Sequence, residues 1–349
     1  MSENLSRIVG ERSVVVCCGS GGVGKTTTAA TLAVEAARQG RRACVVTIDP
    51  AKRLADALGL DGLSNTPGRV AGDWPGELDA LMLDTKSTFD ALVTRYAASP
   101  EQAEGILANR VYRNMSGALS GTQEYMAMEK LHELATSGAY DLIVIDTPPT
   151  RNALDFLDAP RRLTRFLDNR VFKLLMMPTR AYMKAVSLAT QTFLRTISKV
   201  VGGEVVADAV AFFHAFEGME QGFRERADDV SRLLQASSTA FVLVTSPRRD
   251  AVEEAEFFAD QLQEAGIDVD ALVVNRLHPS FGNAAAPEGL GDLGRNLRDF
   301  RSIAEREEQH FQDLASRIAP APVARVPFLV GDVHDLEGLG LVGRHLFGD

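Results

Sequence analysis

Short apolar runs rich in β-branched residues recur along the chain, and several of them are apolar without alternation. An unbroken apolar run is typical of a strand that is covered on both faces of a parallel sheet. Amphipathic stretches with helical spacing separate these runs, and this alternation predicts an α/β fold with a doubly wound, mostly parallel sheet. The expected strands are SVVVCC (13–18), ACVVTI (43–48), LDALML (78–83), DLIVID (141–146), AFVLVT (240–245), DALVVN (270–275) and the weaker ARVPFL (324–329).

The alternation stops between about 151 and 236, where the pattern is helical throughout. In AYMKAVSLATQTFLRTISKVV (181–201), apolar residues recur at steps of three and four, as on one face of a helix. We therefore expect one sheet domain in two parts, 1–151 and 237–349, with a helical subdomain inserted at 152–236. The Gly-, Ala- and Pro-rich segment 278–294 is predicted to be a loop.

Composition places the chain among globular proteins with a sizeable core, because 45% of its 349 residues are hydrophobic and 24% are charged. The net charge of −10 argues against a nucleic-acid partner. Its three cysteines all fall in strand-like runs, which provides no disulfide framework and fits a cytoplasmic location. We see no signal peptide and no apolar run of the ~18 residues that span a bilayer.

The segment GSGGVGKT (19–26) follows the first expected strand and begins the first long helical stretch. In this context the pattern predicts a P-loop, in which glycines let successive N–H groups face phosphate oxygens. The lysine then reaches the β- and γ-phosphates, and the threonine hydroxyl coordinates Mg²⁺. An ordinary Gly-rich turn is the alternative, but it needs neither side chain. The expected phosphate-binding residues are Gly21, Gly22, Val23, Gly24, Lys25, Thr26 and Thr27.

Two aspartates end expected strands: Asp49 follows CVVTI, and Asp146 closes LIVID. Parallel neighbouring strands would bring both acids to the same sheet edge as Lys25. Asp146 is then expected to hold Mg²⁺ together with Thr26. Capping of the following helix is the simpler alternative for either aspartate.

Adenine is the expected base, because the Asn-Lys-x-Asp pattern of a guanine site is missing. The corresponding segment reads VVNRLH, and its Asn275 has an amide that can pair with an adenine edge. The expected substrate is therefore ATP with Mg²⁺.

Five segments in register resemble one family across nearly the whole chain: GSGGVGKTTT, TIDPAKRLADALG, YDLIVIDTPPTRNALDFL, VVNRL and VPFLVGDVHDLEGL. They are similar to motifs of the arsenite-pump ATPase (ArsA) and tail-anchored-protein targeting ATPase family, which has a deviant Walker A loop. The resemblance implies a dimer that closes over ATP, with Asp49 polarising the attacking water. It also implies that Asn275 contacts adenine and that Pro327 and Phe328 lie over the base.

The chain departs from the family pattern at Ser20, where a signature lysine reaches the partner's phosphates. A related partner chain that carries the lysine would restore it in a heterodimer, Arg53 or Arg151 would replace it, or hydrolysis would be slow. The C-x-x-C clasp of some members is also missing, so we expect no structural zinc. Cysteine thiolates of the kind that bind metalloids are not expected either, because all three cysteines are predicted to be buried.

The predicted insert combines methionines and phenylalanines with a strongly basic segment, 161–199, that has nine basic residues and one acidic residue. In the targeting branch, such helices form a methionine-rich groove for an apolar client helix. Here Met176, Met177, Met183 and Met219 would serve, or they are the core of the insert. The basic segment would bind an anionic membrane surface peripherally, or it is a solvated face.

We therefore interpret the chain as a Mg²⁺-dependent ATPase in which nucleotide drives opening and closing of a helical client-binding or membrane-associated subdomain. A positioning ATPase of the MinD/ParA type is one alternative, although the ending LEGLGLVGRHLFGD is a poor membrane helix. A weakly hydrolysing, nucleotide-gated binding subunit of a heterodimer is the other, because Ser20 permits it.

Overall fold

The computed structural model describes residues 2–49, 52–115, 122–148, 165, 218–282 and 291–348. The chain forms two compact units. Unit 1 comprises Met1–Leu83, Glu133–Leu154 and Gln235–Asp349, and unit 2 comprises Asp84–His132 and Asp155–Leu234. The segment 84–132 therefore groups with unit 2, although the sequence pattern placed it in the sheet domain.

Unit 1 contains an eight-stranded sheet of order β3-β4-β2-β5-β1-β6-β7-β8, in which only the β3–β4 pair is antiparallel. All seven expected strands are present, which confirms the doubly wound α/β fold. The two-residue β3 was not expected, because two exposed residues have no apolar pattern. The strands are β1 (Val14–Cys18), β2 (Arg42–Thr47), β3 (Gly68–Arg69), β4 (Glu77–Met82), β5 (Leu142–Asp146), β6 (Thr239–Thr245), β7 (Ala271–Leu277) and β8 (Val323–Pro327).

The register of the central strands brings their carboxyl ends to one level. Asp146 of β5 lies opposite Cys17 of β1 and opposite Thr47 of β2. In the strand order, β2 and β5 lie to one side of β1, and β6 lies next to β1 on the other side, so the direction of the connections reverses at β1. A crevice at such a switch point is where ligands bind in open α/β sheets.

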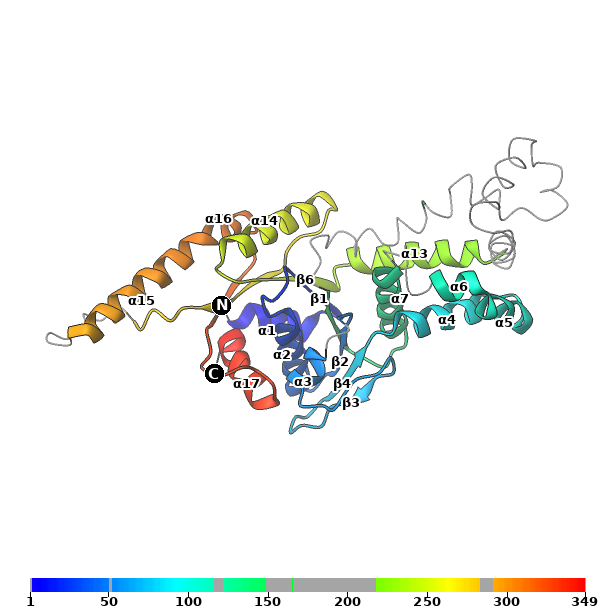
Figure 1. The fold of residues 1–349 in the computed structure, drawn as a ribbon, viewed down its shortest axis with the longest axis horizontal. Helices are drawn as coiled ribbons and strands as arrows, with labels where there is room; N and C mark the ends of the chain where they lie inside the picture. The colour runs from blue at the N-terminus through cyan, green and yellow to red at the C-terminus, as the bar shows by residue number, and fades with distance from the viewer. Residues whose placement is uncertain are drawn as a thin grey trace. The chain divides into compact units, whose positions relative to one another are not determined.

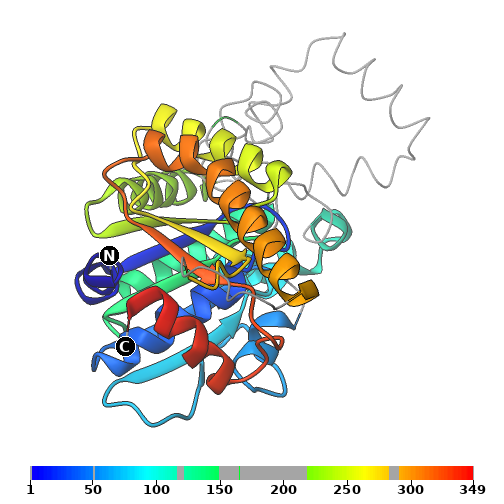
Figure 2. The ribbon, with the colours of Figure 1, turned by 90° about the vertical axis from the view of Figure 1, so that its left-hand side faces the viewer.

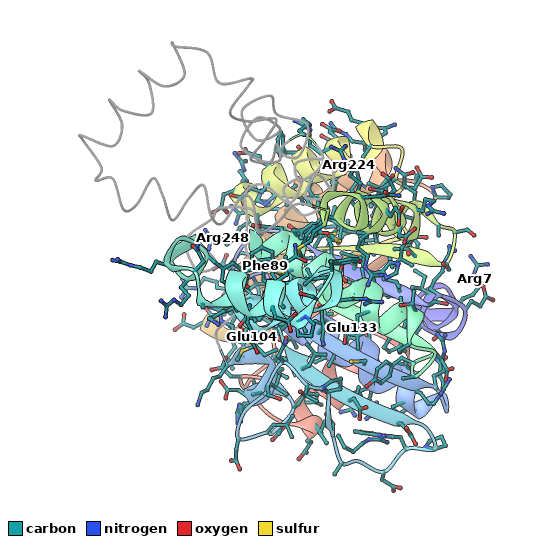
Figure 3. The ribbon with its side chains drawn as sticks, turned by 90° about the vertical axis from the view of Figure 1, so that its right-hand side faces the viewer. Arg7, Phe89, Glu104, Glu133, Arg224 and Arg248 are labelled. Atoms are coloured by element: carbon teal, nitrogen blue, oxygen red, sulfur yellow. The ribbon has the colours of Figure 1, made fainter. Side chains whose placement is uncertain are left out.

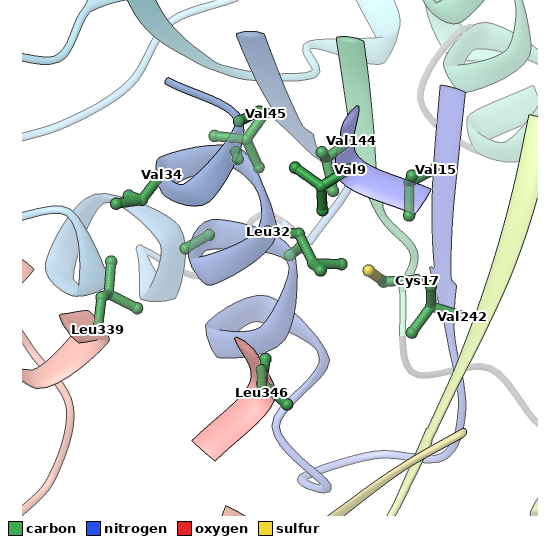
Figure 4. Packing of buried hydrophobic residues seen from close by; sticks show 14 of the residues in the cluster. Val9, Val15, Cys17, Leu32, Val34, Val45, Val144, Val242, Leu339 and Leu346 are labelled. Carbon is green, nitrogen blue, oxygen red and sulfur yellow. The ribbon is translucent and has the colours of Figure 1, made fainter. Parts of the chain in front are cut away.

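Helices cover both faces of this sheet, with α1, α2 and α17 on one face and α14 and α16 on the other (Figures 1 and 2). The small residues of α2 let it pack closely, and Figure 4 shows its Leu32 between Val9 and Cys17. Burial of a leucine of this kind stabilises the fold by about 2 kcal/mol. The helices of unit 1 are α1 (Ser2–Glu11), α2 (Lys25–Arg38), α3 (Arg53–Ala57), α14 (Arg249–Glu264), α15 (Gly291–His310), α16 (Gln312–Arg317) and α17 (Leu336–Phe347).

Unit 2 is helical in its described part. Side chains fix the starts of two helices, since Asp84 accepts the N–H of Ser87 and Ser99 accepts that of Gln102. The ring of Phe89, labelled in Figure 3, lies 5.3 Å from that of Tyr112. The described helices of unit 2 are α4 (Thr85–Tyr96), α5 (Pro100–Ala108), α6 (Arg110–Met115), α7 (Thr122–Thr136, up to His132) and α13 (Glu220–Gln235, up to Leu234).

Most of the expected insert, 152–236, lies outside the described residues. This includes Met176, Met177 and Met183 and all of the basic segment except Arg165, so the client groove and the membrane contact stay predictions. Met219 is described and is buried. No helix within the described ranges is long and apolar enough to cross a membrane.

The predicted loop at 278–294 is wrong at its end, because α15 begins at Gly291. The glycines of this segment predicted a loop. Gly291 instead begins the helix with a φ of 51°, which glycine adopts without strain. Residues 283–290 lie outside the described part.

Candidate functional site

The loop between β1 and α2 depends on its glycines for both conformation and space. Gly19, Gly22 and Gly24 have φ values of 147°, 76° and 101°, which L side chains rarely adopt. A Cβ on Gly19 would lie 2.0 Å from the Val244 carbonyl oxygen. A Cβ on Gly24 would lie 2.1 Å from Asn275 Nδ2, so neither position accepts another residue.

The amino end of α2 is open to an anion. Gly24 is the N-cap, no side chain caps the helix, and its first turn contains no acid. The first N–H groups of a helix have no partner within it, and the helix dipole adds positive potential there. A phosphate group suits this position.

Lys25 lies back across the loop, where its Nζ donates to the Ser20 carbonyl oxygen at 2.7 Å. The side chain is buried, and this burial lowers the pKa of Lys25, while Asp146 opposes the shift. Ser20 is itself only 9% exposed. The residue at the signature position is therefore part of the loop interior and does not extend outward.

Asp146 is buried beneath the loop and accepts two hydroxyl hydrogen bonds at Oδ2. Thr26 Oγ1 donates at 2.8 Å and Thr47 Oγ1 at 2.9 Å. Burial raises the pKa of Asp146 to about 6 despite these bonds. Its Oδ1 is buried without a hydrogen-bond partner within the described part of the chain.

The oxygen atoms of Thr26 and Asp146 fit Mg²⁺, which prefers oxygen ligands and binds proteins through one or two carboxylates. The Thr26 hydroxyl and the Asp146 carboxylate are in contact with each other, and Oδ1 has an open acceptor position. A divalent cation would offset the cost of burying this carboxylate.

Asp49 follows β2 and, like Lys25 and Thr26, lines a cavity at the carboxyl ends of the strands. Its backbone N–H donates to Thr47 Oγ1 at 3.2 Å, and its carboxylate lies 3.7 Å from Arg53 Nη1. Arg53, one of the two arginines considered as a replacement for the lysine, is therefore at the cavity and paired with Asp49. The other, Arg151, lies outside the described residues.

On the other side of the loop, β7 contributes Asn275, whose Nδ2 donates to the Val23 carbonyl oxygen at 2.9 Å. Pro327 ends β8, and the ring of Phe328 beyond it is 61% exposed. Asn275 and Phe328 line one cavity, and an exposed aromatic ring together with a polar amide suits a purine base.

A cavity of about 760 Å³ joins these groups within unit 1. Gly21 and Val23 belong to the loop but do not line the cavity, and Asp146 lies buried next to Thr26. The other predicted site residues all line it: Gly22, Gly24, Lys25, Thr26, Thr27, Asp49, Asn275, Pro327 and Phe328.

Sequence reasoning missed two residues at this site. Thr47 was hidden inside an apolar run, and only the strand register places its hydroxyl on Asp146. Arg276 belongs to the segment VVNRLH, from which only Asn275 was predicted to be at the site, yet its Nη1 donates to the Gly22 carbonyl oxygen at 3.1 Å. The sequence contains one signal for Thr47, which is a hydroxyl residue two positions before Asp49. It contains no signal for Arg276.

A glycine-rich loop that joins the central strand of a parallel sheet to an open helix, followed by Lys25 and Thr26, defines the chain as a P-loop NTPase. More specifically, the chain belongs to the anion-transporting ATPase family, whose model matches residues 12–348. It is thus an ATPase of the ArsA type.

Relatives of this chain have two kinds of name. It is 27% identical to the ATPase GET3 of Malassezia globosa over 347 residues, which cover 98% of this chain and 93% of the relative. It is 23% identical to a putative arsenical pump-driving ATPase of Prosthecochloris vibrioformis, with coverage of 96% and 75%. A similar protein of Aquifex aeolicus is 21% identical, with coverage of 96% and 79%.

The three cysteines, Cys17, Cys18 and Cys44, are buried thiols in β1 and β2, as predicted. Burial raises the pKa of the Cys17 and Cys18 thiols well above the ordinary value. Metalloids bind the thiolate form, so Cys17 and Cys18 are poor ligands in the folded protein.

Proposed function

We propose that this ATPase binds Mg²⁺-ATP in the cavity at the carboxyl edge of its sheet. The observation that carries the proposal is the contact of Thr26 with Asp146 directly below an open P-loop. When bound, Mg²⁺ would neutralise charge that develops between the β- and γ-phosphates.

The residues of the chain then have distinct roles. Lys25 leaves the Ser20 carbonyl and pairs with phosphate, while Thr26 and Asp146 hold the metal. Asp49 orients the attacking water, which needs no strong base because the transition state is loose. Asn275, Pro327 and Phe328 bind the adenine.

We propose that a partner subunit completes this site. The Ser20 side chain is uncharged and buried, so this chain presents no cation from that position. We favour a heterodimer with a related ATPase that carries the lysine, over a homodimer with slow turnover. The resemblance to targeting ATPases suggests an apolar helix or an anionic membrane surface as the client of the helical insert.

Phosphate release from Mg²⁺-ATP tests this function, with Lys25→Ala as the blank. We expect measurable turnover that falls at least about a hundredfold in the variant, because a charge beside the γ-phosphate is lost. A paralogue with the lysine should raise the rate above the sum of the separate chains. Binding of ATP without turnover, alone or in the mixture, would favour the nucleotide-gated binding subunit, and no binding at all would refute the proposal.

A further inference from the structure

Two consecutive side chains of β7 contact the same loop. Asn275 donates to the carbonyl oxygen of Val23, and Arg276 donates to that of Gly22. In a regular strand, successive side chains point to opposite faces of the sheet, so two neighbours cannot both reach one target.

The backbone of β7 shows how this exception arises. The pairing of β7 with β8 shifts register between Asn275 and Leu277, and Arg276 has a φ of 64°. A positive φ is uncommon for a residue other than glycine, and bulges near functional sites redirect a side chain. The strained backbone conformation occurs at Arg276, where it directs the guanidinium onto the phosphate loop.

Peptide geometry shows what the two hydrogen bonds do. In a trans peptide the carbonyl and the N–H of the same unit point in opposite directions. The Gly22 carbonyl shares its peptide with the Val23 N–H, and the Val23 carbonyl shares its peptide with the Gly24 N–H. Holding these carbonyls from outside therefore directs the two N–H groups into the loop, where phosphate oxygens bind.

We propose that Arg276 is a positioning residue that, with Asn275, clamps the outer carbonyls of the phosphate loop and aims the Val23 and Gly24 N–H groups at the nucleotide phosphates. This rests on the proposed function, because it assumes that phosphate binds at this loop. Arg276 is exposed and makes no ion pair with any described residue, and its guanidinium donates to the Gly22 carbonyl oxygen. The Asn275 Oδ1 accepts the Arg276 N–H at 2.9 Å, which links the two residues.

The test uses Arg276→Gly, since glycine accepts the φ of 64° and the variant should fold. Calorimetry would compare Mg²⁺-ADP with Mg²⁺-pyrophosphate, which lacks the base. We expect both affinities to fall by a similar factor, roughly 3- to 10-fold, the effect of one lost hydrogen bond. Arg276→Lys should recover part of the loss, because it keeps a donor. The matched control is Arg298→Ala on α15, which removes an exposed charge outside the cavity and should change neither affinity.

Amide hydrogen exchange of residues 19–27 in the nucleotide-free protein reads the clamp without any ligand. Faster exchange in Arg276→Gly than in wild type and Arg298→Ala would support it. Unchanged exchange, or a loss of ADP affinity that spares pyrophosphate, would overturn it, because Arg276 would then act on the nucleotide itself. If the wild type bound no nucleotide, the proposed function would fail, and the exchange result would still decide whether the clamp exists.

Discussion

Two aspartates at opposite ends of β5 have opposite environments. Asp141, just before the strand, is 38% exposed and pairs with Arg42 at 2.7 Å, and these hydrogen bonds lower its pKa to about 2. Asp146, at the other end, is buried, and burial raises its pKa to about 6. The first carboxylate is satisfied by its own chain, whereas the second is held at a cost that a bound cation would offset. We interpret Asp141 as a structural acid and propose that Asp146 is a functional one.

The largest expected effect is on catalysis. Asp146→Asn keeps an oxygen for the hydroxyls of Thr26 and Thr47 but removes the charge that the proposed Mg²⁺ would need. We expect ATPase activity to fall at least about a hundredfold, as when one group that stabilises transition-state charge is removed. Asp141→Asn should retain activity close to that of the wild type. Equal losses in the two variants, measured by phosphate release, would contradict the distinction.

A smaller effect is expected on stability, where the order of the two variants is reversed: Asp141→Asn should lose stability and Asp146→Asn should not. Without metal, Asp146→Asn relieves a buried charge, so its free energy of unfolding should match or exceed that of the wild type by about 1 kcal/mol. Asp141→Asn loses a surface ion pair, and its Tm should fall by about 1–2 °C. Denaturant and thermal unfolding in a chelator would measure both. A clear loss of stability in Asp146→Asn would show that this acid is also structural.

The smallest expected effect is on the pH dependence of stability at low pH. The folded-state pKa of Asp141 is depressed to about 2, below its ordinary value of 3.8. Its contribution to stability is therefore present above about pH 4 and is lost as the pH falls toward 2. The stability gap between wild type and Asp141→Asn should close over that interval. A gap of the same nonzero size at pH 3 and pH 6 would show that it does not arise from the charge of Asp141, and the absence of a gap at both would show that the ion pair contributes nothing.

Much of this fold follows from periodicity. Strands buried on both faces must be apolar along their whole length, which is why β1, β2 and β5 are evident in the sequence. Periodicity does not show what a helix packs against, and so the grouping of 84–132 with unit 2 could not be predicted. The short β3 has too few residues for any pattern.

The site divides in the same way. The P-loop is contiguous, so its residues and their order can be recognised directly in the sequence. The Thr47 hydroxyl reaches Asp146 only through the register of β2 with β5. Arg276 reaches the loop only because β7 is irregular at that residue. Contacts of this kind depend on backbone geometry that no local residue pattern specifies.

The two margins of the sheet limit how copies of the chain can associate. One margin ends in the two exposed residues of β3, where Arg69 pairs with Asp79. The other ends in β8, where Pro327 lacks an N–H and Arg325 pairs with Glu308. Short, charged or proline-containing margins are poor templates for an added strand. Two subunits would therefore associate through side-chain surfaces. The backbone hydrogen bonds of the sheet would not continue from one subunit into the next.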